Sequence, residues 1–268
     1  MTRLYATAEI GFLSATGVAP LAVDIEDGRS APDAFSWQTN GFELRRLPSA
    51  VTDWNDATQH TGIHADEVTA FATAETGCDA VLFYPPLLRS PKAAQESADY
   101  APIPTAHSDY TEDYGPMLGD TGHPYHALIS PSMIRAGVDP GRIRDCRRIL
   151  TLQLWRNLGP ALMADPLCVA DARTVPRDKL VPLRVETYGG HEAQFDAFGV
   201  LPADDDAPYR WVTFPEMQPD EVLLFRAFDS DRVAAQRPFW TPHCAFPDPR
   251  GAGTPRSSIE MRAICLFW

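Results

Sequence analysis

Several features that would place a chain in a membrane or in an oxidising compartment are missing from this sequence. No apolar run approaches the roughly 20 residues that a helix needs to span a bilayer. The first residues lack the apolar stretch and cleavage site of a secretory signal. The five cysteines are scattered, odd in number and form no CxxC pair, which argues against a disulfide framework or a zinc ribbon. We therefore expect a cytoplasmic protein in a reducing compartment, without a membrane partner.

A basic patch is missing as well. The chain carries 23 Lys and Arg residues against 36 Asp and Glu residues, a formal net charge of −13. Nucleic-acid binders normally show a dense basic surface. The densest group of basic residues in the sequence consists of Arg142, Arg144, Arg147 and Arg148. We interpret it as a solvated helix face or strand edge. These charges predict no nucleic-acid partner, and they leave the oligomeric state open.

Proline is abundant and helical periodicity is rare. The 25 prolines in 268 residues interrupt helices and strand ladders. One helix is predicted over 64–77, with Asp66 as its N-cap and Gly77 as its end. A buried strand is expected over 79–86, loops over 90–104 and 115–141, and a short helix within the latter at 131–136.

The rest of the chain reads as short strands separated by turns. Alternation of apolar and polar residues predicts strands over 148–158, 166–175, 183–190, 193–201, 209–214, 220–230, 239–246 and 258–268. This pattern favours a mainly β fold, a jelly roll or barrel with flanking helices. We expect one domain over 1–268, in which 1–100 form an N-terminal extension packed on a core at 101–268.

One histidine-acid pair suggests a metal site. Chance supplies about one H-x-[DE] pattern in a chain of this composition, and two are present, at His64-Ala65-Asp66 and at His107-Ser108-Asp109. Helix capping by Asp66 explains the first. The second lies where a loop enters a strand, so that both side chains point to the same side. A metal site is therefore predicted at His107 and Asp109.

A third ligand and an anion clamp follow later in the chain. His243 lies on an apolar strand, and two histidines with one carboxylate form the facial triad that binds non-haem Fe(II). The closing strand begins 13 residues later, and Arg256, Ser258, Glu260 and Arg262 share one of its faces. Arg256 and Ser258 therefore project together, as a carboxylate clamp requires.

Several blocks of the chain resemble the hydroxylase/desaturase family of natural-product biosynthesis, which includes AsaB-type and CmcJ-like proteins. The blocks are FSWQTNGFELRRLPSAVTDWND (35–56), HSDYT (107–111), LQLWRNLGP (152–160), PLCVADARTV (166–175), FPEMQPDEVLLFRAFDSD (214–231), TPHCAFPDP and PRSSIEMRA. The resemblance implies a double-stranded β-helix core, of the cupin-like jelly-roll type, with Fe(II), 2-oxoglutarate and O₂. It places the iron ligands on His107, Asp109 and His243, and the 2-oxoglutarate clamp on Arg256 and Ser258. The segment 115–141 departs from the family in being longer and richer in Gly, Pro and His.

The expected activity is that of an Fe(II)/2-oxoglutarate-dependent dioxygenase. It would hydroxylate, desaturate or oxidatively cyclise a small metabolite in secondary-metabolite biosynthesis. Halogenases of this type usually have a small residue in place of the carboxylate ligand, so Asp109 argues against halogenation. Two alternatives stay open. One is a non-haem iron enzyme that does not use 2-oxoglutarate, in which Arg256 holds a carboxylate of the substrate. The other is a non-catalytic accessory protein on the same fold.

Further residues are candidates for the pocket. Arg262 is the second choice for the 2-oxoglutarate clamp. Tyr110 is either a substrate contact, a neighbour that supports the metal ligands or a core residue. Trp155 and Arg156 lie mid-strand, where a buried arginine needs a partner, either 2-oxoglutarate, the substrate or a carboxylate such as Asp171. Arg89 would bind an acidic substrate or lie at the surface.

Overall fold

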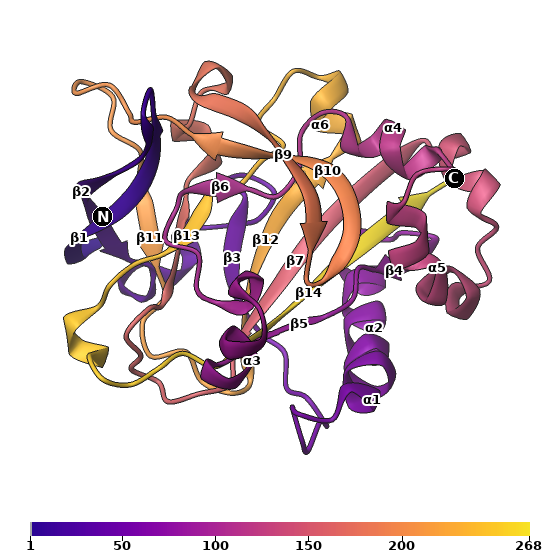
Figure 1. Ribbon diagram of the computed structural model, residues 1–268, viewed down its shortest axis with the longest axis horizontal. Coiled ribbons are helices and arrows are strands. Elements are labelled where there is room, and N and C mark those ends of the chain that lie inside the picture. Colours follow the sequence, from indigo (N-terminus) through magenta and orange to yellow (C-terminus); the bar gives the residue numbers. More distant parts are fainter. Residues whose placement is uncertain (1) are drawn as a thin grey trace.

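Two β-sheets that face each other form the centre of the computed structural model, which describes residues 2–268 (Figure 1). The larger sheet has the strand order β1-β2-β11-β8-β13-β6-β10-β9. The smaller has the order β3-β12-β7-β14-β4, with β5 also paired to β14. This is the mainly β, jelly-roll architecture that the short strands predicted.

The eight strands of the larger sheet are β1 (Arg3–Ser14), β2 (Gly17–Asp27), β6 (His107–Ser108), β8 (Leu167–Ala170), β9 (Leu180–Tyr188), β10 (His191–Val200), β11 (Trp211–Thr213) and β13 (His243–Ala245). Those of the smaller sheet are β3 (Phe42–Arg46), β4 (Ala80–Phe83), β5 (Leu87–Arg89), β7 (Arg148–Asn157), β12 (Glu221–Asp229) and β14 (Ser258–Phe267). The α-helices are α1 (Ala57–Gln59), α2 (Ala65–Thr76), α3 (Pro91–Glu96), α4 (Tyr114–Gly119), α5 (Tyr125–Ala136) and α6 (Ser230–Ala234).

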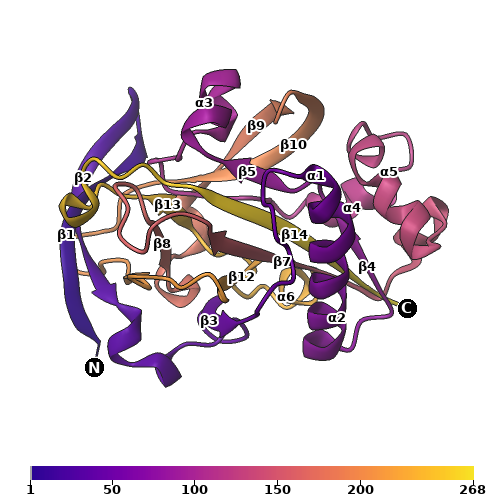
Figure 2. The same cartoon turned by 90° about the horizontal axis from the view of Figure 1, so that it is seen from below.

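Alternation along β7 separates an apolar face from a polar one. Leu150, Leu152 and Leu154 pack in one cluster with residues of α2, which covers the outer face of the smaller sheet (Figure 2). Successive side chains of a strand point to opposite faces, so Gln153 and Trp155 point to the space between the sheets. The inner face therefore carries the polar residues from which a site can be built.

The first hundred residues lengthen both sheets at their edges. The hairpin of β1 and β2 joins the larger sheet beside β11, whereas β3 and the β4–β5 pair flank the two sides of the smaller sheet. A division of the chain at residue 100 stays a prediction.

The predicted helix over 64–77 is confirmed as α2, and Gly77 ends it in the left-handed conformation with φ 68°. The predicted cap is wrong. Helical structure begins earlier, at α1, where the Asp56 side chain accepts from the backbone N–H of Thr58, and it continues through a π-helical turn at His60–His64. Asp66 lies in the first turn of α2 and pairs instead with Arg135.

The two segments expected to be loops contain helices. Ser90 caps α3, and Pro91 occupies its first turn, a position where the missing N–H of proline costs nothing. The segment 115–141 contains α4 and α5, and the short helix predicted at 131–136 is the second half of α5. Pro131 lies inside α5, so the helix begins further towards the N-terminus than the predicted bounds.

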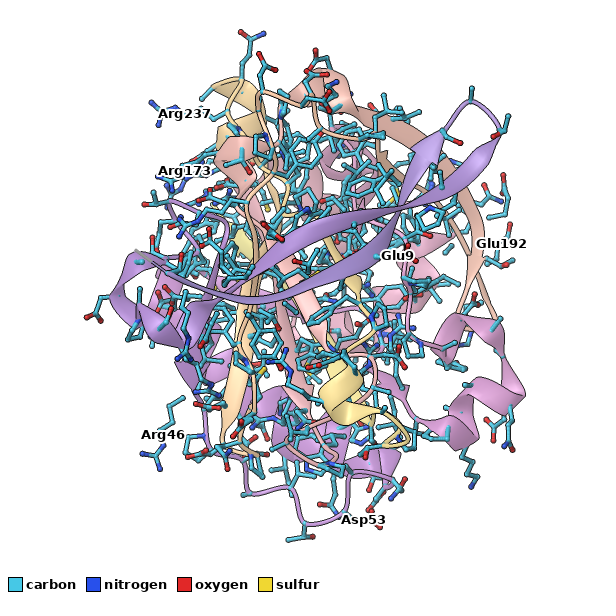
Figure 3. The ribbon with its side chains drawn as sticks, turned by 90° about the vertical axis from the view of Figure 1, so that its left-hand side faces the viewer. Glu9, Arg46, Asp53, Arg173, Glu192 and Arg237 are labelled. Carbon is cyan, nitrogen blue, oxygen red and sulfur yellow. The ribbon has the colours of Figure 1, made fainter. Side chains whose placement is uncertain are left out.

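The surface carries charges of both signs. On the side shown in Figure 3, the exposed side chains of Glu9, Arg46, Asp53, Arg173, Glu192 and Arg237 point away from the ribbon. Within residues 2–268, no helix has both the length and the apolar character needed to cross a membrane.

Candidate metal centre

Three potential metal ligands meet between the sheets. His107 on β6 and His243 on β13 are paired directly across neighbouring antiparallel strands, and their ring centroids lie 4.4 Å apart. Asp109 follows β6, with its Oδ1 3.8 Å from Nε2 of His243. One ligand atom from each residue lies within 4.8 Å of those of the other two. The structure thus brings together the three residues that the sequence predicted as iron ligands.

Both imidazoles are oriented by a backbone carbonyl two residues earlier. Nδ1 of His107 donates to the carbonyl oxygen of Thr105 at 2.8 Å, and Nδ1 of His243 donates to that of Thr241 at 3.0 Å. In a neutral imidazole, this leaves the lone pair on Nε2, the atom that a metal needs. Burial, followed by the proximity of His243, lowers the pKa of His107 to about 4, so this ring is neutral near pH 7.

Asp109 is ionised despite its burial. Burial alone raises the pKa of a carboxyl group, but the Arg262 guanidinium and then the two histidines outweigh it, so that the pKa of Asp109 lies well below its usual range. Two imidazoles and one carboxylate are the donor set of non-haem Fe(II) centres. The residues present therefore fit this metal.

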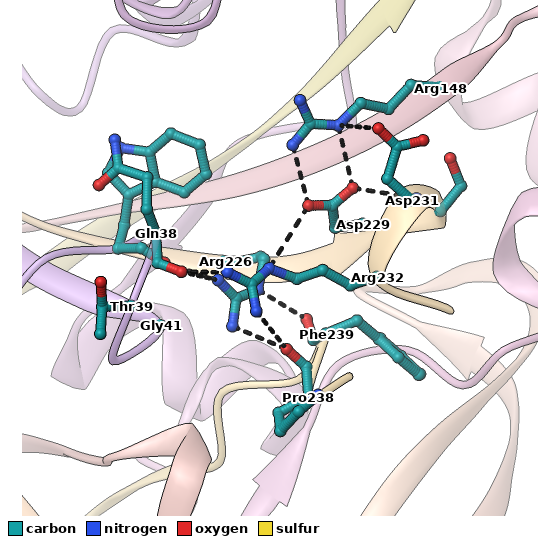
Figure 4. Close-up of polar contacts among 12 residues, drawn as sticks. Gln38, Thr39, Gly41, Arg148, Arg226, Asp229, Asp231, Arg232, Pro238 and Phe239 are labelled. Carbon is teal, nitrogen blue, oxygen red and sulfur yellow. Dashed lines mark hydrogen bonds and ion pairs between the residues drawn. The ribbon is translucent and has the colours of Figure 1, made fainter. Parts of the chain in front are cut away.

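The loop before β13 is fixed by a buried arginine (Figure 4). Arg226 on β12 donates to four backbone carbonyls, those of Trp37 at 2.6 Å, Pro238 at 3.0 Å, Phe239 at 3.2 Å and Gln38 at 3.4 Å. Thr241 is held in addition by its hydroxyl, which donates to the carbonyl of Gly41 at 3.1 Å. Since the carbonyl of Thr241 orients the ring of His243, these contacts fix the position of a candidate metal ligand.

Four buried charges of alternating sign lie side by side, two on β14, one on β5 and one just after β6. Arg89 Nη2 lies 3.2 Å from Glu260 Oε1, Arg262 Nη2 lies 3.4 Å from the same oxygen, and Arg262 Nε lies 3.2 Å from Asp109 Oδ2. Two arginines and two carboxylates therefore neutralise each other beside the metal centre. Arg262, predicted as the second choice for the 2-oxoglutarate clamp, donates to the candidate metal ligand Asp109.

Arg256 is a buried cation without an anion. Its side chain is 6% exposed, and no carboxylate of residues 2–268 lies within ion-pair distance of it. Nη1 donates to the backbone carbonyl of Asp165 at 3.1 Å, while Nε has no partner in the described chain. The neighbouring Ser258 hydroxyl is fully buried and also has no partner there. Burial lowers the pKa of Arg256 to about 10, which still leaves it charged at neutral pH.

Gln153 is a buried polar residue beside the candidate centre that the sequence did not single out. It lies on the inner face of β7, fully buried, and neither atom of its amide group has a partner in the described residues. The same holds for the indole N–H of Trp155, two residues along the same face, and the Arg256 guanidinium lies 5.7 Å from the ring of Trp155. The signal was present in TLQLW, where polar and aromatic residues alternate with leucines.

Tyr110 belongs to an aromatic cluster beside the metal centre. Its ring stacks on Tyr114 with 3.7 Å between centroids, and its hydroxyl lies 2.8 Å from that of Tyr125. The Arg262 guanidinium lies over the rings of Tyr84 and Tyr188 in the same region. Tyr110 is therefore a buried residue that packs against other tyrosines next to Asp109.

Two predicted pocket arginines have other partners. Arg156 faces the opposite side of β7 from Trp155 and donates to the carbonyls of Pro219 at 2.6 Å and Leu47 at 2.7 Å. It therefore lies outside the metal centre, and it does not pair with Asp171, whose partner is Arg173. Arg89 is buried, not at the surface, and donates to Glu260, to the Tyr188 hydroxyl and to the carbonyls of Asp99 and Ala101.

Three other histidines make contacts outside the candidate centre. His126 donates from Nε2 to the carbonyl of Leu118 at 2.7 Å, and His123 Nδ1 accepts from the backbone N–H of Tyr125 at the start of α5. His64 contacts Glu67 within the helical segment, so its role is structural, although Asp66 does not form the predicted cap.

The fold and the donor set define a jelly-roll protein with a metal centre of two histidines and one carboxylate. Over residues 13–266, the chain matches the family described as oxidoreductase/YMDC permease-like domain. The chain belongs to this family and is an oxidoreductase.

Its relatives bear the names that the sequence resemblance predicted. The chain is 27% identical to hydroxylase/desaturase CTB9 of Cercospora beticola over 92% of this chain and 76% of the relative. It is 25% identical to the Fe(II)/2-oxoglutarate-dependent dioxygenase nvfI of Aspergillus novofumigatus over 91% and 83% of the two chains. Hydroxylase/desaturase asaB of Aspergillus flavus is 35% identical over 43% of this chain and 54% of the relative. The resemblance to the hydroxylase/desaturase family is thereby confirmed.

A solved structure shares the fold. The iron and alpha-ketoglutarate-dependent endoperoxidase NvfI superposes with a TM-score of 0.75 at 21% identity, over 99% of each chain. This likeness confirms the predicted fold class.

Proposed function

We propose that this protein is an Fe(II)/2-oxoglutarate-dependent dioxygenase that oxidises a small metabolite in secondary-metabolite biosynthesis. The observation that carries the proposal is the unpaired cation of Arg256 in the same cavity as the metal ligands. His107, His243, Arg256, Glu260 and Arg262 all line this cavity. A buried arginine without a carboxylate partner calls for an anionic ligand. Relatives named as 2-oxoglutarate-dependent dioxygenases favour 2-oxoglutarate as this anion over a carboxylate of the substrate.

The charges of the cavity support a dicarboxylate ligand. Three buried arginines, Arg89, Arg256 and Arg262, face two buried carboxylates, Asp109 and Glu260, which leaves one positive charge over. That charge is on Arg256, because the other two arginines are paired. In the proposal, Arg256 and Ser258 bind the carboxylate of 2-oxoglutarate that is remote from the metal, through charge-assisted hydrogen bonds. The donors of Arg262 are already engaged, so it is the weaker candidate for this role.

The metal ligands have distinct tasks in this scheme. His107, Asp109 and His243 would hold Fe(II), which when bound supplies the redox chemistry with O₂ and 2-oxoglutarate. The carbonyls of Thr105 and Thr241 keep both imidazoles in the tautomer that exposes Nε2. Arg262 keeps Asp109 ionised, and the aromatic cluster around Tyr110 excludes water from that side of the centre.

The substrate class and the compartment are proposed on more general grounds. Relatives carry names such as hydroxylase/desaturase and dioxygenase, which suit a small-molecule substrate. All five cysteines are free thiols, four of them buried, in keeping with a reducing compartment such as the cytoplasm.

Anaerobic titration tests this function. Addition of Fe(II) and then 2-oxoglutarate to the purified protein is expected to produce a weak visible charge-transfer band, which requires chelation of the iron by 2-oxoglutarate. The His243→Ala protein should show no band and no iron-dependent succinate formation. His126→Ala is the matched control, because that histidine lies outside the centre, and it should retain both. An iron-binding protein that gives no band with 2-oxoglutarate would contradict the co-substrate assignment.

A further inference from the structure

Gln153 has the burial and the polarity of a ligand-binding residue, but no protein partner. Its side chain is 0% exposed, and neither the amide oxygen nor the amide nitrogen has a hydrogen-bond partner in the part of the chain that the structure describes. Buried amides are normally paired, because an unpaired donor or acceptor loses its bonds to water without replacement. An exception of this kind next to a metal centre points to a missing ligand.

The strand register places Gln153 opposite the metal ligands. β7 lies between β12 and β14, and Gln153 is paired with Phe225 on one side and with Arg262 on the other. The ring of Phe225 lies 4.6 Å from that of His243, and Arg262 is bonded to Asp109. Gln153 therefore projects from the smaller sheet between two side chains that touch metal ligands of the larger sheet.

We propose that Gln153 donates a hydrogen bond from Nε2 to the metal-side carboxylate of 2-oxoglutarate. This inference rests on the proposed function. Trp155, which lies beneath the Arg256 guanidinium, is two residues away on the same face, about 7 Å along the strand. This spacing is on the scale of an extended five-carbon dicarboxylate. Gln153 then serves the end of the molecule near the metal, and Arg256 with Ser258 the remote end.

Replacement of Gln153 separates this role from a structural one. Gln153→Leu keeps the size of the side chain and removes an unpaired amide, so the protein without ligands is expected to be at least as stable as the wild type. Its affinity for Fe(II) alone should stay unchanged. Its dissociation constant for 2-oxoglutarate should rise roughly 10-fold, with a shifted charge-transfer maximum, because a hydrogen bond to a charged group is lost.

Two further variants sharpen the test. Gln153→Glu, which is nearly isosteric, places a carboxylate against a carboxylate and should weaken 2-oxoglutarate binding more than Gln153→Leu does. Thr151→Val, one step along the same face of β7 and further from Arg256, is the matched control and should leave the affinity and the band unchanged.

Opposite results have distinct meanings. If wild type forms the band and both Gln153 variants bind 2-oxoglutarate as tightly as wild type with an unshifted maximum, the assignment of Gln153 is wrong while the proposed function stands. The assignment is equally wrong if Thr151→Val reproduces the loss of affinity. If wild type itself forms no band, the proposed function fails.

Discussion

Single side chains of the centre differ in whether their charge is already compensated. Arg89 and Arg262 have carboxylate partners within the protein, whereas Arg256 has only the carbonyl of Asp165 and the face of Trp155. A buried cation of this kind gains most from an incoming anion, since its desolvation is already complete in the folded protein. The affinity for 2-oxoglutarate should therefore depend on this residue.

A graded series at Arg256 is expected to show this dependence. Arg256→Lys keeps the charge but loses the planar pair of donors, and it should raise the dissociation constant of 2-oxoglutarate by roughly 10-fold. Arg256→Gln, which loses the charge as well, should raise it by roughly 100-fold. Titration of the charge-transfer band measures both, with Arg156→Gln, a buried arginine outside the centre, as control. Equal affinities across the series would place the anion elsewhere.

His64 should make stability depend on pH. Burial, followed by the positive charge of Arg156, lowers its pKa to about 4 in the folded protein, against about 6.5 when unfolded. Between these values the unfolded state binds a proton that the folded state excludes, so the free energy of unfolding falls as the pH is lowered from 6.5 towards 4. His107 acts in the same direction.

Urea unfolding at several pH values checks the role of His64. His64→Gln should flatten the decline between pH 6.5 and 4 and leave the part that His107 contributes. A variant with the slope of the wild type would show that His64 is protonated in the folded protein.

The residues of the centre were predictable to different degrees. His107, Asp109, His243, Arg256 and Ser258 could be found because alternation on a strand fixes the face of a side chain. The group with which each arginine pairs could not be predicted in this way. Arg256 and Arg262 share a face, and only the fold shows that Asp109 takes up Arg262 and leaves Arg256 free. Whether the Gln153 amide has a hydrogen-bond partner likewise depends on the residues that the fold places around it.

At the scale of elements, the loop before β13 depends on Arg226. Arg226→Met would leave the carbonyls of Trp37 and Phe239 buried without a donor and would remove one of the two donors to Pro238. Each unpaired carbonyl costs about 1–3 kcal/mol. We expect the free energy of unfolding to fall by about 3 kcal/mol or more, and the affinity for Fe(II) to fall as the backbone of Thr241 loosens.

Chemical denaturation and metal titration of Arg226→Met give the two readouts. Arg232→Met is the control, because it removes a half-buried arginine that also donates to the carbonyl of Pro238. It should lower the free energy of unfolding much less than Arg226→Met does. If Arg226→Met bound Fe(II) like the wild type, the loop would not position His243.

The turn that leads to Arg256 depends on a glycine. A Cβ at Gly251 would lie 2.0 Å from the carbonyl oxygen of Met163, whereas a Cβ at Gly253, with φ +81°, would meet nothing within 4 Å. Gly251→Ala requires the backbone to move and should lower the free energy of unfolding by about 3 kcal/mol. Gly253→Ala adds only the strain of a positive φ and should lower it by about 1 kcal/mol. Thermal unfolding compares them. Equal losses would show that the turn can shift without cost.

For the whole molecule, the fold class followed from the sequence more readily than its helices did. Short alternating segments such as 183–190 and 220–230 predict a two-sheet fold because each must bury one face. The helices α3 and α4 have few residues, and α5 contains Pro131, so local propensity opposes what tertiary packing stabilises. The position of β1–β5 at the sheet edges required strand pairings that periodicity does not encode.

Metal loading should stabilise the entire chain. A ligand that binds only the folded state adds about 2.7 kcal/mol of stability at a concentration 100 times its dissociation constant. Anaerobic Fe(II) is therefore expected to raise the melting temperature of the wild type and to leave that of His243→Ala unchanged. A similar rise in both proteins would locate the binding elsewhere.

The direct pairing of β6 with β13 has a consequence for the path of unfolding. His107 and His243 are neighbours across the sheet but lie 136 positions apart in the chain (243 − 107 = 136). An ion shared by both would act as a removable cross-link that closes a loop of about half the chain. Opening that loop would require the ion to leave first, so the loaded protein should resist proteolysis for longer than its gain in equilibrium stability alone would suggest.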